Sequence, residues 1–556
     1  MFKKQFYGFR FLAVLVLFTS LLSCGVSKSL KDIPDVSLYK INIAERIQKN
    51  DSTFISGPNT LSKNKQGQWE MYVEGNPYQI GLTTGLLTKE LFKYQEHAFL
   101  SKVNELVPSK TKQWLLRKML AWYNRKMYLN VPEEYKAEIY GLSQYAASDY
   151  KHIADNYLRI LYLHSAHDIG HALQDLALVG CSSFAAWDNN TKDGNLIIGR
   201  NFDFYAGDDF AKNKIIAFVK PTNGYKFMSV TWAGMIGVVS GMNEHGLTVT
   251  INAGKSKIPL VAKTPISIVT REILQYAKNI DEAIAIAKKR EVFVSESIFI
   301  GSAIDNKAIT IEVSPKNFGV YESPNTGQLI CSNHFQSNAY KNDKNNIKHK
   351  AESHSQYRYE RMQELLNTNN KLTVKKAIAV LRNKEGLNNK NIGFGNEKSL
   401  NQLLAHHGIV FKPSELLVWV SSNPYQLGEF VAYNLNEVFS DVDKLQLSNQ
   451  ALNIEKDAFL YTKAYSDYES YRTFSRTLEK AISKDLKVEN KLLTNVIETN
   501  PNYWKAYYLV GKYYYNKGYL TAALQMFETA LTKEITTVPD KEMVAHYIQK
   551  INRKLN

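Results

Sequence analysis

The run Gly180-Cys-Ser-Ser-Phe-Ala-Ala-Trp187 is followed, after a short turn-forming segment, by the run Ile197-Ile-Gly-Arg-Asn-Phe-Asp-Phe204. Both runs are short and rich in apolar residues, with turn-forming residues between them, as in two neighbouring β-strands. Cys181 opens the first run, and the second delivers Arg200 and Asp203. This pattern places a thiol, a cation and a carboxylate close together, which favours a strand-based catalytic domain.

The order of these residues predicts that Cys181 becomes the N-terminus of a new chain when the protein is cleaved. A thiol with a pKa of about 8.5 can give its proton to an α-amine with a pKa of about 7.7–8.0, so an N-terminal cysteine supplies both nucleophile and base. Such a site also needs oxyanion donors and a cation. Gly180 tolerates the strained backbone that attack on its carbonyl requires. We therefore expect self-cleavage between Gly180 and Cys181.

The first residues, 1–24, have the features of a lipoprotein signal peptide. Basic residues precede an apolar run at 11–18, and Leu21-Leu-Ser-Cys24 matches a bacterial lipobox. We expect Cys24 to be acylated and to anchor the protein in the bacterial cell envelope. Gly25 is not the aspartate that is associated with inner-membrane retention, which favours the outer membrane. An uncleaved anchor and a plain secreted form are the alternatives.

Length and composition limit the other possibilities. A chain of 556 residues with 44% hydrophobic and 22% charged residues indicates a globular protein of two or three domains. The net charge of +16 suggests a solvated surface near anionic lipid rather than nucleic-acid binding, because we expect export. The three cysteines, Cys24, Cys181 and Cys331, form no disulfide framework, and a Cys181–Cys331 bridge would extinguish the nucleophile.

Three segments follow the signal peptide. Residues 25–180 are predicted to be mostly helical, with one short strand at 70–75. Residues 181–440 are predicted to form an α+β domain. Helices are expected there at 267–288 and 357–366, surface loops at 337–352 and 383–400, and a turn at His406-His407-Gly408. Strands are expected at 196–198, 215–219, 227–232, 247–251, 297–300, 308–313, 416–420 and 428–433.

The last segment, residues 455–556, is predicted to be entirely helical. Its small and aromatic residues fall in the register of a tetratricopeptide-like repeat: Tyr507, Val510, Gly511, Tyr514, Gly518, Ala523, Phe527 and Ala530. A single repeat cannot bury both faces, so it should pack on the main domain or on a protein partner. An ordinary two-helix cap is the alternative.

Several motifs in order carry a resemblance to a known family. They are Gly75-Asn-Pro-Tyr-Gln-Ile-Gly81, Gly180-Cys-Ser-Ser, Gly199-Arg-Asn-Phe-Asp203, Gly241-Met-Asn-Glu-His-Gly-Leu247, Cys331-Ser-Asn-His-Phe335 and Ser355-x-x-Arg358-x-x-Arg361. Residues 70–435 resemble the N-terminal-nucleophile hydrolases of the penicillin acyltransferase and choloylglycine hydrolase group. The resemblance implies a four-layer αββα sandwich preceded by a helical pro-segment. It also implies autoproteolytic cleavage between Gly180 and Cys181, as in the acyltransferase branch, into two chains that stay together non-covalently.

The resemblance also implies roles for individual residues. They are Cys181 as nucleophile, Asp203 as the carboxylate that positions the amine, Arg200 as the thiolate-side arginine, Asn252 and Asn333 as oxyanion asparagines, and Arg358 as the arginine that completes the network. The implied reaction takes a small-molecule N-acyl substrate through an acyl-Cys181 thioester to hydrolysis or acyl transfer. No cofactor and no metal are implied.

Two alternatives stay open at this point. The chain could be a catalytically inert envelope lipoprotein that acts as a binding or assembly module through its C-terminal end. His164, His167 and His171 are spaced so that His167 and His171 could share a metal on a helix, although packing of that helix is the simpler interpretation. The sequence does not define the acyl group.

Overall fold

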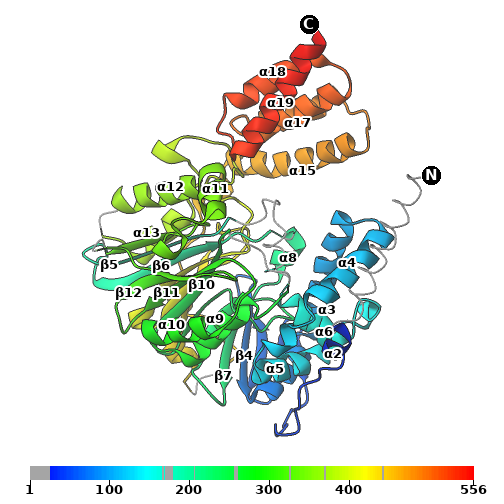
Figure 1. Cartoon of the computed structure of the whole chain (residues 1–556). Coiled ribbons are helices and arrows are strands. Elements are labelled where there is room, and N and C mark those ends of the chain that lie inside the picture. Colours follow the sequence, from blue (N-terminus) through cyan, green and yellow to red (C-terminus); the bar gives the residue numbers. More distant parts are fainter. Residues whose placement is uncertain are drawn as a thin grey trace, which may run out of the picture.

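The computed structural model describes residues 25–165, 168, 180–205, 207–255, 261–324, 327–368, 371–440 and 444–555. The expected signal peptide with Cys24 lies outside the described residues, as do His167 and His171. The described chain is a mixed α/β structure, as expected. Figure 1 shows central strands flanked by helices, with the C-terminal helices gathered at one end.

The larger of the two sheets has eleven strands, in the order β1-β2-β3-β4-β7-β8-β9-β10-β11-β12-β13. Neighbouring strands are antiparallel except for β4 and β7, which run parallel. The strands are β1 (Ile47–Asn50), β2 (Thr53–Ser56), β3 (Asn59–Lys63), β4 (Trp69–Gly75), β7 (Ile215–Pro221), β8 (Phe227–Thr231), β9 (Ser240–Asn243), β10 (Leu247–Ala253), β11 (Glu296–Ser302), β12 (Lys307–Val313) and β13 (Phe318–Tyr321).

The smaller sheet has six antiparallel strands and contains most of the two runs at 180–187 and 197–204. Those runs form the predicted neighbouring strands β5 and β6, paired so that Ser183 lies opposite Arg200. In order across the sheet, the strands are β14 (Gln328–Cys331), β5 (Ser182–Asp188), β6 (Gly194–Phe202), β15 (His407–Lys412), β16 (Leu417–Ser421) and β17 (Phe430–Asn434).

The alternation of side chains along the strands explains where the core lies. Ile198 on β6 belongs to a buried cluster that also contains Phe218 and Phe299 from the larger sheet, so this cluster joins the two sheets. Its neighbour Ile197 points the other way, into a cluster with Ile378. This period of two is the geometry of a strand with both faces buried.

Helices cover the outer face of each sheet (Figure 1). On the larger sheet, α9 (Ile266–Tyr276) and α10 (Ile280–Lys289) replace the single helix expected at 267–288, because Asn279 caps a second helix. On the smaller sheet lie α12 (Ser355–Thr368) and α13 (Val374–Leu381). The loop expected at 337–352 is partly wrong, because Asp343 caps α11 (Lys344–Glu352).

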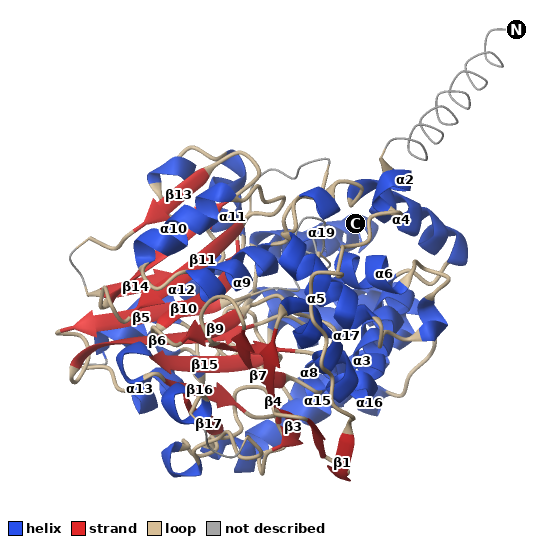
Figure 2. Cartoon of the chain, turned by 90° about the horizontal axis from the view of Figure 1, so that it is seen from below, coloured by secondary structure: helices blue, strands red, loops and turns tan. Residues whose placement is uncertain are grey.

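The N-terminal segment is built into the larger sheet. Its helices α2 (Val26–Ser29), α3 (Pro77–Leu106), α4 (Lys110–Tyr123), α5 (Glu133–Ser143) and α6 (Asn156–Leu163) gather on one side of the strands (Figure 2). Strand β4 was predicted, but β1, β2 and β3 were not. On α5, the Glu138 carboxylate lies 3.1 Å from the Arg271 guanidinium of α9, and both side chains are buried. The segment is therefore held by strand pairing and by a buried ion pair.

The C-terminal segment is helical, as expected. It contains α15 (Lys463–Ser483), α16 (Asn490–Glu498), α17 (Trp504–Asn516), α18 (Leu520–Leu531) and α19 (Val538–Leu555). Its buried cluster includes Leu403 and Leu427 from the preceding domain, so these helices pack on that domain. Within the described ranges, no helix has both the length and the apolar character needed to cross a bilayer.

Candidate active site

Cys181 lies in the buried interior, directly before β5, with 1% of its surface exposed. The backbone N–H of Gly180 donates to the carbonyl of Asp203 at 3.2 Å, so the chain around the cysteine is fixed against the end of β6. Burial raises the pKa of the Cys181 thiol to about 11, while the positive charge of Arg200 opposes that rise. The thiol therefore needs a nearby base before it can act as a nucleophile.

Arg200 supplies the positive charge beside the sulfur. One guanidinium nitrogen, Nη2, lies 3.6 Å from Cys181 Sγ and also donates to the carbonyl of Ile251. The other, Nη1, donates to Ser240 Oγ at 2.5 Å and to the carbonyl of Val239 at 3.2 Å. Four contacts therefore fix the plane of the guanidinium, and a fixed cation lowers the cost of forming a thiolate.

Asp203 is a buried carboxylate whose two oxygens make no hydrogen bond of regular geometry within the described part of the chain. Burial raises its pKa to about 7, and the charges of Arg358 and Arg200 and the amide of Gln426 oppose that rise. A carboxylate with this pKa exchanges protons near neutrality.

Arg358 connects the nucleophile to the loop after β14. Its Nη1 donates to the Cys181 carbonyl at 2.6 Å and to Ser182 Oγ at 2.8 Å. Its Nη2 donates to Asn333 Oδ1 at 2.5 Å, and its Nε contacts His354 Nδ1 at 3.2 Å. The planar fork of an arginine can reach all these acceptors at once, which a lysine cannot.

The two candidate oxyanion asparagines differ in how many donors they have left. An asparagine amide has two N–H donors. Asn333 uses one of them on the carbonyl of Ala253, at 2.9 Å. Asn252 directs its amide nitrogen at the carbonyls of Cys331 and Ser332, at 3.1 and 3.3 Å. Within the described part of the chain, Asn333 therefore keeps one amide donor without an acceptor, whereas the donors of Asn252 are engaged.

The structure thus brings the predicted site residues together from separate segments. Cys181, Arg200, Asn333 and Arg358 are joined by direct contacts, and the charge of Asp203 acts on Cys181. Asn252 lies next to them and accepts a hydrogen bond from Ser183 Oγ at 2.9 Å. These contacts describe the placement of the residues, and their chemical roles stay predictions.

A second layer of buried polar residues surrounds the site and was not predicted from the sequence. His406-His407-Gly408 does not form the expected turn: His407 begins β15, and both histidines are buried. His407 Nε2 lies 2.9 Å from Ser240 Oγ, and this hydroxyl also accepts a hydrogen bond from Arg200 Nη1. The carboxylate of Glu296 also acts on Cys181 and raises its pKa. Only pairing of distant segments creates these contacts, so no local pattern could have revealed them.

The structure also shows the surroundings of Cys331 and His164. Cys331 ends β14 and is buried, and both Cys181 and Cys331 are free thiols. His164 Nε2 accepts the backbone N–H of Ile236 at 3.0 Å, while Nδ1 lies 2.8 Å from the carbonyl of Ile160. His164 therefore serves helix packing. No group of three potential metal ligands occurs within the residues that the structure describes.

Part of the chain is similar to a known protein family. Residues 189–419 match the family model for acyl-coenzyme A:6-aminopenicillanic acid acyl-transferase. This match confirms the acyltransferase side of the resemblance, over less than half of the chain. It includes Arg200, Asp203, Asn333 and Arg358 but begins after Cys181.

Two curated relatives have related sequences. An uncharacterised protein of Archaeoglobus fulgidus is 26% identical over 276 residues, which cover 46% of this chain and 45% of the relative. Protein dcd1A of Dictyostelium discoideum is 24% identical over 281 residues, covering 46% of this chain and 59% of the relative. The chain thus spans about half the length of the curated relatives it matches.

Two solved structures are also similar. The Caenorhabditis elegans orthologue of N-acylethanolamine-hydrolyzing acid amidase is 18% identical, with a TM-score of 0.31, covering 42% of this chain and 93% of that one. A mutant of conjugated bile acid hydrolase from Clostridium perfringens is 15% identical, with a TM-score of 0.32, covering 46% of this chain and 93% of that one.

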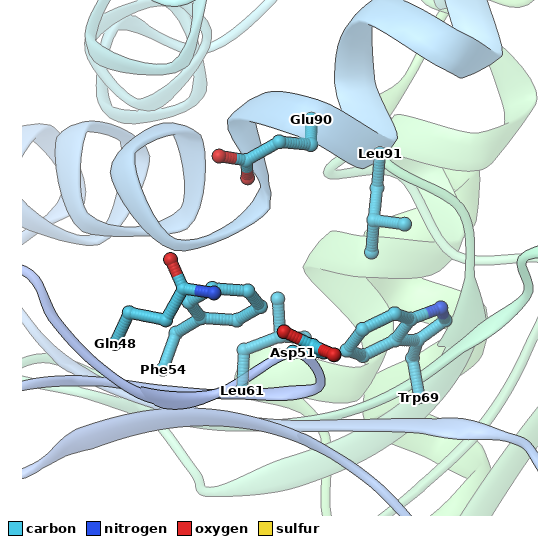
Figure 3. Close-up of a pocket in the computed structure, with 7 residues that line it drawn as sticks. All are labelled: Gln48, Asp51, Phe54, Leu61, Trp69, Glu90 and Leu91. Carbon is cyan, nitrogen blue, oxygen red and sulfur yellow. The ribbon is translucent and has the colours of Figure 1, made fainter.

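An open cavity of about 230 Å³ lies between β1–β4 and α3 (Figure 3). Apolar and polar side chains share its walls: Gln48, Asp51, Phe54, Leu61, Trp69, Glu90 and Leu91. None of the residues around Cys181 lines it, and the cavity shows no arrangement of groups that suggests a reaction.

Proposed function

We propose that this chain is a self-processing cysteine amidohydrolase or acyltransferase with an αββα core. The observation that carries this proposal is Cys181 directly before β5, with Arg200 3.6 Å from its sulfur and Arg358 2.6 Å from its carbonyl. The acyltransferase family match over residues 189–419 supports the same class of chemistry, amide hydrolysis or acyl transfer.

The proposed activation step breaks the peptide bond between Gly180 and Cys181. Cys181 Sγ attacks the Gly180 carbonyl carbon, the C–N bond breaks, and the thiol proton ends on the released nitrogen. Water then hydrolyses the thioester, leaving a Gly180 carboxylate and a free Cys181 with an α-amine. Asp203 is the proposed acceptor for the thiol proton, because its pKa of about 7 and its buried position beside the cysteine suit that role.

The mature enzyme would use the new α-amine as its base. The amine takes the thiol proton, and Asp203 orients the resulting ammonium group. Sγ attacks the carbonyl of an N-acyl substrate, Asn333 donates to the oxyanion, and the amine of the substrate leaves with a proton. Water completes hydrolysis of the acyl-Cys181 thioester, and a second amine would complete acyl transfer instead.

The proposed setting is the cell envelope. Lipidated Cys24 would hold the protein at a membrane, and water would be the abundant acyl acceptor there, which favours hydrolysis of a small-molecule N-acyl compound. The C-terminal helices would form a tetratricopeptide-like unit that can also recruit a protein partner. An inert binding module remains the competing function.

Intact mass measurement and N-terminal sequencing of purified protein beginning after Cys24 test the proposal. The expected result is two fragments that stay together, the second beginning at Cys181. Cys181→Ala should give a single uncut chain without amidase activity. Cys331→Ala is the matched control, because Cys331 is equally buried and should remain dispensable for cutting. An uncut wild-type chain, or a cut Cys181→Ala chain, would contradict the proposal and favour the binding module.

A further inference from the structure

The carbonyl of Gly180 has a side-chain donor of its own. Gln402 Nε2 donates to this oxygen at 3.0 Å, and Gln402 is 2% exposed. The backbone N–H of Gly180 is also engaged, with the Asp203 carbonyl. The residue before the cysteine is therefore held on both sides, and its carbonyl oxygen faces an amide N–H in a site shielded from water.

We propose that Gln402 is the oxyanion donor for self-cleavage at Gly180-Cys181, and that the C-terminal helices hold it in place. The inference rests on the proposed function. It assigns Gln402 to the activation step alone, because Gln402 contacts the carbonyl of the bond to be cut.

Two other polar groups of the site donate to different carbonyls. Arg358 donates to the carbonyl of Cys181, one residue beyond the bond that breaks. Asn252 directs its donors at the Cys331 and Ser332 carbonyls. When Sγ attacks, the electron pair of the C=O bond moves onto the Gly180 oxygen. A donor already aligned with that oxygen stabilises the charge without any reorganisation.

The glycine at position 180 is also explained by this contact. A Cβ at this position would lie 2.3 Å from Gln402 Nε2 and 2.9 Å from its Oε1. Any larger residue would therefore push the amide away from the carbonyl that it contacts. Gly180 and Gln402 thus fit one another, and the fit provides a second way to disturb the contact.

The C-terminal helices hold the loop that carries Gln402. Leu403, the next residue, is completely buried in the cluster formed by these helices. The backbone of Leu403 has φ 52°, a region that residues other than glycine rarely occupy, so surrounding contacts must hold the backbone there. One such contact is the hydroxyl of Tyr468 on α15, which donates to the Leu403 carbonyl at 3.2 Å.

The test measures how fast the Cys181 N-terminus appears in the full chain. Gln402→Met keeps the size of the side chain but removes its donors, and should slow cleavage about 100- to 1000-fold, the usual effect of losing one oxyanion donor. Gly180→Ala should slow it similarly by displacing Gln402. Tyr468→Phe should slow it less, through the loop. Gln525→Ala, on the exposed face of α18, is the control and should cleave like wild type.

Added hydroxylamine separates the two chemical steps, because it cleaves a thioester but does not speed its formation. In Gln402→Met the slow step should be thioester formation, so hydroxylamine should leave the rate low. Restoration of the rate, or wild-type cleavage by both Gln402→Met and Gly180→Ala, would overturn the inference. Wild-type cleavage by Tyr468→Phe would overturn the role of the C-terminal helices. A wild-type chain that never cuts would overturn the proposed function itself.

Discussion

Replacing Arg358 by lysine keeps the charge at the centre of the site but removes the planar fork. Arg358 donates to the Cys181 carbonyl, Ser182 Oγ and Asn333 Oδ1 at 2.5–2.8 Å. A lysine ammonium can satisfy the acceptors on one side only, so we expect at least one buried acceptor to lose its donor. Loss of one or two charge-assisted hydrogen bonds, at about 1.5–3 kcal/mol each, predicts a destabilisation of about 1.5–6 kcal/mol.

Two measurements separate folding from chemistry. Urea unfolding in a Cys181→Ala background, where no cutting complicates the transition, reports the free energy of unfolding. The rate at which a new Cys181 N-terminus appears in the Arg358→Lys chain reports the chemistry. Because the arginine orients the cysteine backbone, we expect that rate to fall at least tenfold, about 1.4 kcal/mol in the barrier.

Arg361 offers a matched control three residues along the same helix. It is equally buried, but it binds Asn383, Glu364 and Asn389 instead of the cysteine. Arg361→Lys should therefore destabilise the fold without a specific loss of cleavage at equal folded fraction. The reasoning would be refuted if Arg358→Lys cut at the wild-type rate with unchanged unfolding free energy, or if both variants lost cleavage equally.

Two further perturbations test the electrostatics and the attachment of the N-terminal segment. Burial raises the pKa of Asp203 from 3.8 to about 7, so the stability that this group contributes is full below pH 3.8 and falls by about 4 kcal/mol as the pH rises to 7. Asp203→Asn in the Cys181→Ala background should flatten this pH dependence of the unfolding free energy in urea titrations. Identical pH curves with and without Asp203→Asn would contradict this role of Asp203. Glu138→Ala leaves the buried Arg271 charge without its carboxylate partner and should lower the unfolding free energy by about 3–5 kcal/mol. The side chain of Glu133 is 75% exposed, so the control Glu133→Ala should change the unfolding free energy by less than about 1 kcal/mol. Similar losses in the two variants would contradict the importance of the buried pair.

Much of the fold could be predicted because its pattern is local. The alternation around Ile197 and Ile198 indicates a strand with two buried faces, and the structure places their side chains in different clusters. Strands β1–β3 escaped prediction because each contains only one or two apolar residues, and β1 is exposed along its whole length. A run of that kind has no side-chain pattern to distinguish it from a loop.

The candidate site could be predicted where a motif carries it, and not where only packing creates it. Arg200 and Asp203 are close to Cys181 because adjacent strands pair in a fixed register, which the sequence already indicates. Gln402 and His407 reach the site from a loop and a strand more than 200 residues after the cysteine. Their contacts depend on the C-terminal helices and on the order of strands in the smaller sheet, and neither leaves a local signal.

The parallel pairing of β4 with β7 has a consequence for refolding. Its register runs from Trp69 opposite Ile215 to Gly75 opposite Pro221, and these residues lie on either side of the proposed cut. Before cutting, both strands belong to one molecule and recovery from unfolding does not depend on concentration. After cutting, the same pairing requires two separate polypeptides to meet, so recovery becomes bimolecular and slow in dilute solution. The uncut chain would then unfold reversibly, whereas the lifetime of the cut protein would be set by its unfolding rate.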